Sequence, residues 1–130
     1  MSDVKFCLFA STPDMLDLSF VVKVLTGTPD ELGQRAMEWG YDGIEFMPDP
    51  EHVPDPEVFA TALRRTGAVM PVVNTGRVAA QGMALLHENA GVRRKSITGF
   101  KDILDFAGRS QGGDGTVGRG CVSGARGTRR

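Results

Sequence analysis

Residues 28–47 read TPDELGQRAMEWGYDGIEFM, and this stretch predicts a helix followed directly by a strand. Thr28 and Glu31 have the spacing of a capping box, and the proline that follows Thr28 suits the first helical position. Apolar residues then recur at helical spacing until Gly40 ends the helix. The β-prone residues 41–47 give the strand.

The same order of elements recurs on both sides of this stretch. Residues 4–10 form a β-prone run before it. After it, Asp55 caps a second helix that ends at Gly67, residues 68–73 predict another strand, and Asn89 caps a third helix. Strands and helices that alternate over short connections favour a parallel sheet with right-handed crossovers. The sequence therefore predicts an α/β protein with about three β/α units.

Two details of the sheet stay open at this point. The apolar run 19–25 is too short for a convincing helix, so it is either an extra strand or an extended segment of a long first loop. Pro71 lacks a backbone donor, which disfavours a central position for the strand that contains it.

The repeating pattern ends at Gly108. Residues 108–130 contain eight glycines and no Leu, Ile, Phe or Met, so they bury too little apolar surface to offset the entropy of ordering. We predict a folded part at 1–107 and a disordered Gly/Arg-rich tail at 108–130. A closed (β/α)8 barrel needs about 250 residues, so we expect an incomplete TIM barrel, and a change of reading frame is one interpretation of the tail.

Charge and composition narrow the classes of function. The tail carries five arginines and one aspartate, yet no Phe, Tyr or Trp follows Phe106, so we do not expect nucleic acid as a partner. No apolar run approaches the ~18 residues of a membrane span, and the start lacks a signal peptide's apolar stretch; we expect a cytoplasmic protein. Cys7 and Cys121 lack metal-site spacing, and Cys7 is predicted to be a buried thiol.

Five short segments, taken in order, resemble the xylose isomerase-like TIM barrels, the sugar phosphate isomerase/epimerase family. The resemblance covers residues 4–107 and implies the amino-terminal part of a barrel. The matching segments are 40–45 (GYDGIE), 73–76 (VNTG), 85–89 (LLHEN), 92–94 (VRR) and 103–107 (ILDFA).

This resemblance implies a role in carbohydrate metabolism, in which a sugar or sugar phosphate undergoes metal-assisted proton transfer next to its carbonyl. The divalent cation of such enzymes (Mn, Mg, Zn or Co) is held on later strands, so no metal ligand is carried over to this sequence. We therefore expect a truncated isomerase or epimerase that binds no cofactor and is inactive alone. The alternative is a non-catalytic fragment that forms a homo-oligomer through exposed sheet edges.

Candidate site residues follow from the edge where parallel strands end, which in such folds gathers the loops 11–27, 48–54 and 74–89. Glu45 leaves one strand and is a candidate catalytic group that orients a sugar hydroxyl or assists proton transfer, or else it is a solvated acid. His87 is the second catalytic candidate, and the alternative is that it only flanks a helix cap.

Four consecutive residues after the next strand are predicted to bind substrate, with a plain turn as the alternative. Their amide, hydroxyl, open backbone and guanidinium groups suit a polyol or a phosphate; they are Asn74, Thr75, Gly76 and Arg77. The loop before the second helix has metal-capable side chains, which we interpret as solvated rather than ligating; they are Asp49, Glu51, His52 and Asp55.

Overall fold

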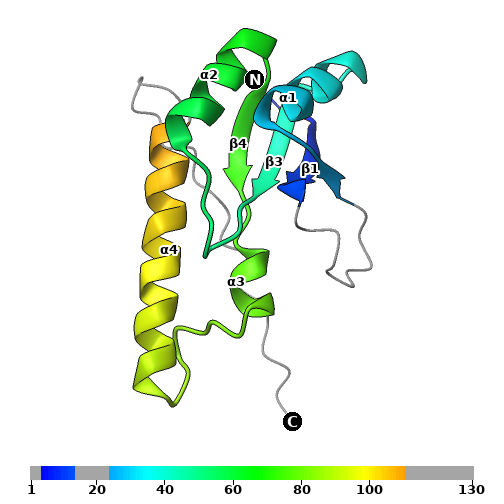
Figure 1. The fold of residues 1–130 in the computed structure, drawn as a ribbon. Helices are drawn as coiled ribbons and strands as arrows, with labels where there is room; N and C mark the ends of the chain where they lie inside the picture. The colour runs from blue at the N-terminus through cyan, green and yellow to red at the C-terminus, as the bar shows by residue number, and fades with distance from the viewer. Residues whose placement is uncertain (1–3, 14–23, 111–130) are drawn as a thin grey trace.

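The computed structural model describes residues 4–13 and 24–110, which fold as an α/β unit with a parallel sheet (Figure 1). In the sheet the strands lie in the order β2-β1-β3-β4, and every pair is parallel. The α/β class and the parallel pairing predicted from the sequence are thus confirmed. The elements are β1 (Cys7–Ser11), β2 (Leu25–Thr26), α1 (Pro29–Glu38), β3 (Gly43–Met47), α2 (Pro56–Thr66), β4 (Val69–Val73), α3 (Gly76–Ala80) and α4 (Ala90–Ser110).

The first two helices begin where the sequence predicts; α2 also ends at the predicted Gly67, whereas α1 ends at Glu38, just before the predicted Gly40. At α1 the Glu31 amide donates to Thr28 Oγ1 at 3.3 Å, and the Thr28 amide donates to Glu31 Oε2 at 2.8 Å, which completes the capping box. At α2 the Glu57 amide donates to Asp55 Oδ1 at 2.8 Å. Gly67 closes that helix with a φ of 78°, a left-handed conformation that glycine adopts without strain.

Pro71 lies in β4, at the edge of the described sheet, beside an irregularity in pairing. Gly43 pairs with Val69 but Glu45 pairs with Val72, so β4 contains one more residue than β3 over this step. Edge strands and bulges are the places where a missing backbone donor is tolerated. The proline is therefore compatible with the strand that the sequence predicts.

The hydrophobic core lies between the sheet and the helices that cover one of its faces. The α1 and α2 helices pack over that face, and α4 packs beside α2 (Figure 1). Rings from a strand and two helices meet there, with centroids 4.4 Å apart for Phe46 and Phe59 and 5.2 Å apart for Phe59 and Phe106. Because side chains alternate along a strand, Phe9 and Glu45, which are paired in register, point away from these helices.

Three sequence predictions need correction. The loop expected over 74–89 contains α3, which begins at Gly76. The last helix continues past the predicted boundary at 107, through Gly108 to Ser110. Cys7 is half-buried rather than buried. The remaining tail, 111–130, and most of the apolar run 19–25 lie outside the described residues, although β2 includes the end of that run.

No helix within the described ranges is long and apolar enough to cross a membrane.

Candidate functional site

The carboxyl ends of β1, β3 and β4 lie at one edge of the sheet, and α3 lies directly beyond them (Figure 1). Glu45 was expected to leave its strand, but it is the middle residue of β3, two positions before the carboxyl end, and pairs with Phe9 of β1 and Val72 of β4. Asn74 follows β4 immediately, and its backbone N–H group donates to the Phe46 carbonyl at 2.7 Å. Residues that are 29 positions apart in the sequence, Glu45 and Asn74, are thus brought together.

Asn74 holds Glu45 in a fixed position. The Asn74 Nδ2 group donates to Glu45 Oε1 at 2.8 Å, while Asn74 Oδ1 accepts from the Gly76 amide at 2.7 Å. Only one orientation of the Asn74 amide satisfies both hydrogen bonds. Among the described residues, Asn74 is the only hydrogen-bond donor to Glu45, so Oε2 remains able to accept from a ligand. Both side chains are half-buried.

A buried ion pair joins the segments that follow β3 and β4. Arg77 and Asp49 are each about 5% exposed, and Arg77 Nη2 lies 3.1 Å from Asp49 Oδ2. Arg77 Nη1 also donates to Thr12 Oγ1 at 3.3 Å. Arg77 therefore connects the segment after β4 with the segments after β1 and β3. Its guanidinium contacts protein groups, as expected of a residue that positions loops.

Further donors satisfy the Asp49 carboxylate. Gln81 Nε2 donates to Oδ1 at 2.7 Å, the Glu51 amide donates to Oδ1 at 2.9 Å, and His52 Nδ1 lies 3.3 Å from Oδ2. Burial acts to raise the pKa of Asp49, but the hydrogen bonds from Gln81, Glu51 and His52, together with the charge of Arg77, outweigh it and hold the pKa below its ordinary value. Asp49 is thus an ionised, structural carboxylate.

These contacts make the 48–54 loop a poor cation site, because Arg77, Gln81 and the Glu51 amide already bind the Asp49 oxygens. The Asp55 carboxylate is also engaged, because it accepts from the Glu57 amide as the cap of α2. Across the described ranges, no three His, Cys, Asp or Glu side chains are grouped to hold a metal ion. The side chains of this loop therefore do not supply the ligands of the divalent cation that the family resemblance implies.

The depressed pKa of Asp49 gives a prediction for stability against pH. Because the folded-state pKa is below the unfolded value, Asp49 stabilises the fold above pH ~4 and this contribution is lost as the pH falls through the folded pKa. We expect the urea midpoint to fall on acidification below about pH 4. The same titration of Asp49→Asn should be flatter, and parallel curves for the two proteins would contradict the assignment.

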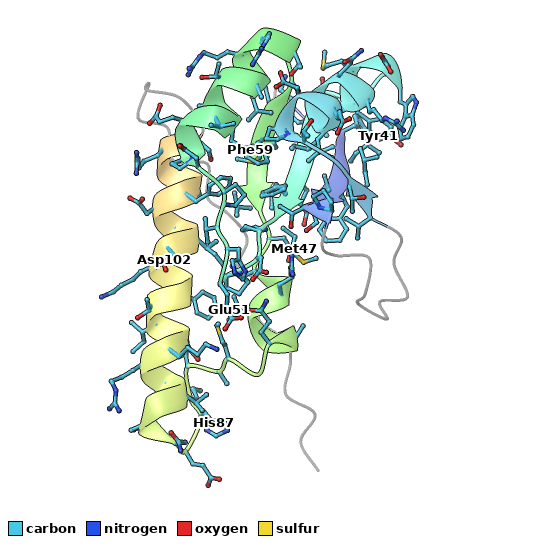
Figure 2. All side chains as sticks on the ribbon, viewed as in Figure 1. Tyr41, Met47, Glu51, Phe59, His87 and Asp102 are labelled. Atoms are coloured by element: carbon cyan, nitrogen blue, oxygen red, sulfur yellow. The ribbon has the colours of Figure 1, made fainter. Side chains whose placement is uncertain are left out.

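His87 is separated from the strand-end cluster, which consists of Glu45, Asp49 and residues 74–77. Figure 2 shows it near the first turn of α4, far from Met47 at the end of β3. Its Nδ1 atom accepts from the Asn89 amide at 3.0 Å, and its carbonyl accepts from Arg93 Nη1 at 2.7 Å. Asn89 in turn caps α4 by accepting from the Gly91 amide at 2.8 Å. Of the two roles that the sequence left open for His87, these contacts favour the cap.

Thr75 and Gly76 form the entry to α3. Thr75 occupies the cap position but makes no side-chain cap hydrogen bond, and both residues are half-buried beside Asn74. A Cβ atom on Gly76 would lie 3.0 Å from Asn74 Oδ1 and 3.1 Å from Met47 Sδ. A side chain at position 76 would therefore require Asn74 and Met47 to shift by a few tenths of an ångström.

Sequence reasoning missed three residues of this edge, Thr12, Asp49 and Gln81. Asp49 was expected to be solvated, but it is buried and paired. Their positions in the sequence could have indicated that Asp49 and Arg77 lie close together, because each follows the end of a predicted strand by a few residues. Parallel strands bring such positions together. Gln81 carries no comparable signal, since it lies beyond a helix that was not predicted.

Comparison of the sequence with models of known protein families finds no match, and a search of the curated proteins finds none either.

Proposed function

We propose that this chain provides the first three β/α units of a (β/α)8 sugar isomerase or epimerase, and that its strand-end cluster contacts the sugar. One observation supports this above others. The carboxylate of Glu45, in the middle of β3, is held by Asn74, which follows the carboxyl end of β4, and barrels of this type place their chemistry at that edge of the sheet. The motif resemblance supplies the reaction class, and the geometry supplies a group able to take part in it.

The proposed reaction is proton transfer next to a sugar carbonyl. Glu45 would orient a hydroxyl group or accept a proton through Oε2, and Asn74 would fix the carboxylate against rotation. Thr75 and Gly76 would border the bound sugar. Arg77 is predicted from the sequence to contact substrate. In this proposal it instead holds the loops in position, because its guanidinium is paired with Asp49. In the enzyme family that the sequence resembles, a divalent cation would polarise the carbonyl.

The first test is sugar binding to the Glu45→Gln variant. Loss of a charged acceptor weakens a hydrogen bond by about 1.5–3 kcal/mol, so we expect sugar affinity to fall roughly tenfold or more. Ligand-observed NMR titration of the full chain with D-fructose and D-xylose measures this affinity. The thermal transition should stay close to that of the unchanged protein, since Glu45 is half-buried.

Glu38→Gln is the matched control. Glu38 also accepts a side-chain amide hydrogen bond, from Gln34 Nε2 at 2.8 Å, but it lies on the exposed surface of α1. Its removal should leave sugar binding unchanged. Equal losses in the two variants, or no binding by the unchanged chain, would contradict the proposed function.

A second proposal is that the chain acts as a non-catalytic, self-associating protein. It is favoured by the position of β4 at the edge of the described sheet, where Val69 is exposed, and by Phe9 and Val72, which lie half-buried on the face turned away from the helices. Size-exclusion chromatography with light scattering should then give a dimer or larger assembly. A monodisperse, cooperatively unfolding monomer would rule this proposal out.

A further inference from the structure

Building on the proposed function, we propose that the strand-end cluster selects an uncharged sugar or polyol over the corresponding phosphate ester. The selectivity comes from the charges at the carboxyl edge. Among the described residues that follow β1, β3 and β4, Arg77 is the cation that could face a phosphate, and it is already paired with Asp49. Glu45, hydrogen-bonded to Asn74 at the same edge, has no cationic partner among the described ion pairs.

The first step is the burial of Arg77 against Asp49. Its side chain is 6% exposed, and the facing side chain of Asp49 is 8% exposed. A phosphate group would have to replace Asp49 at Nη2, or Thr12 at Nη1, inside a site that is closed to solvent. Displacing Asp49 would leave a buried carboxylate without its countercharge, which is strongly unfavourable. Arg77 is therefore committed to the protein.

The second step is the position of the other cations within ranges 4–13 and 24–110. Lys5 precedes β1 and so lies at the opposite, amino-terminal edge of the sheet. Lys95 of α4 pairs with Glu51, and Arg93 donates to the His87 and Glu88 carbonyls. The remaining described cations belong to α1, α2 and α4 rather than to the segments after β1, β3 and β4; they are Arg35, Arg64, Arg65, Arg94, Lys101 and Arg109.

The third step is the sign of the charge on the sheet face turned away from the helices, to which Glu45 belongs. Glu45 has no cationic partner among the described ion pairs, and its Oε2 atom accepts rather than donates. The pKa of the Cys7 thiol is raised, first by burial and then by the charges of Asp42 and Glu45, so the carboxylates act across this face. Hydroxyl groups donate to such a surface, whereas a phosphate dianion is repelled by it.

The experiment compares matched ligands on the full chain. D-fructose and D-fructose 6-phosphate are titrated separately at one ionic strength, with binding followed by ligand-observed NMR, and inorganic phosphate is added as a competitor. We expect D-fructose to bind at least tenfold more tightly than its phosphate ester, and inorganic phosphate to leave its binding unchanged. In Glu45→Gln the ratio of the affinities for D-fructose and D-fructose 6-phosphate should fall, because the carboxylate that repels the phosphate is gone. Circular dichroism confirms that the variant is folded.

The outcomes separate this inference from the proposed function. Tighter binding of the phosphate ester, or displacement of D-fructose by inorganic phosphate, would overturn the inference and leave a sugar-binding role intact. A preference for D-fructose that is the same in Glu45→Gln would also overturn it, because the selectivity would then have another origin. Binding of neither sugar would overturn both proposals.

Discussion

Asp49→Ala should lower the free energy of unfolding by about 3–5 kcal/mol, because it removes the carboxylate that pairs with the buried Arg77 guanidinium. The two side chains are 8% and 6% exposed, so water cannot replace the lost contact without opening the edge of the sheet. Gln81 and the Glu51 amide lose an acceptor in the same variant. Urea denaturation followed by circular dichroism measures the loss.

A double variant separates the charge from the packing. In Asp49→Leu/Arg77→Met both charges are replaced by apolar groups, so we expect most of the stability to return. Asp102→Ala is the control, since Asp102 lies exposed on α4 (Figure 2), and its effect should stay within about 0.5 kcal/mol. A loss below about 1 kcal/mol in Asp49→Ala would mean that the pair is not buried as described.

The elements that the sequence predicted well are those specified by neighbouring residues. The start of α1 is fixed by Thr28 and Glu31, which contact each other, and the end of α2 by the conformation of Gly67. Short strands flanked by such helices pair in parallel for topological reasons. The α/β class therefore follows from local signals, while the closed barrel and the sugar chemistry rest on the motif resemblance and remain proposals.

The features that escaped prediction depend on residues distant in the sequence. The pairing of Asp49 with Arg77 joins positions 28 apart, and the side chains alone gave no preference for burial over solvation. The α3 helix is five residues long, too short for a periodic apolar pattern to be visible. Glu45 and Asn74 were both expected at the strand-end edge, but their direct hydrogen bond required the register of β3 and β4.

Gly43→Ala is the second large effect that the structure predicts, and we expect a loss of about 3 kcal/mol or more. A Cβ atom at Gly43 would lie 1.8 Å from the Val69 carbonyl oxygen and 2.6 Å from the Val69 nitrogen. These are backbone atoms of the neighbouring strand, so no side-chain rotation relieves the contact. The requirement for glycine comes from this close approach and not from the backbone conformation, because the φ angle of Gly43 is not positive.

Relief of the clash would require β3 and β4 to separate at the start of their pairing. The hydrogen bond from the Val69 amide to the Asp42 carbonyl, 3.0 Å long, would then be lost as well. Gly108→Ala is the matched control, because among the described residues no atom outside the backbone of α4 itself lies within 4 Å of the added Cβ. Alanine should stabilise this helix by up to about 1 kcal/mol. Urea midpoints of the two variants should therefore move in opposite directions. An unchanged midpoint for Gly43→Ala would show that β4 does not meet β3 at Val69, and the position of Asn74 beside Glu45 would lose its basis.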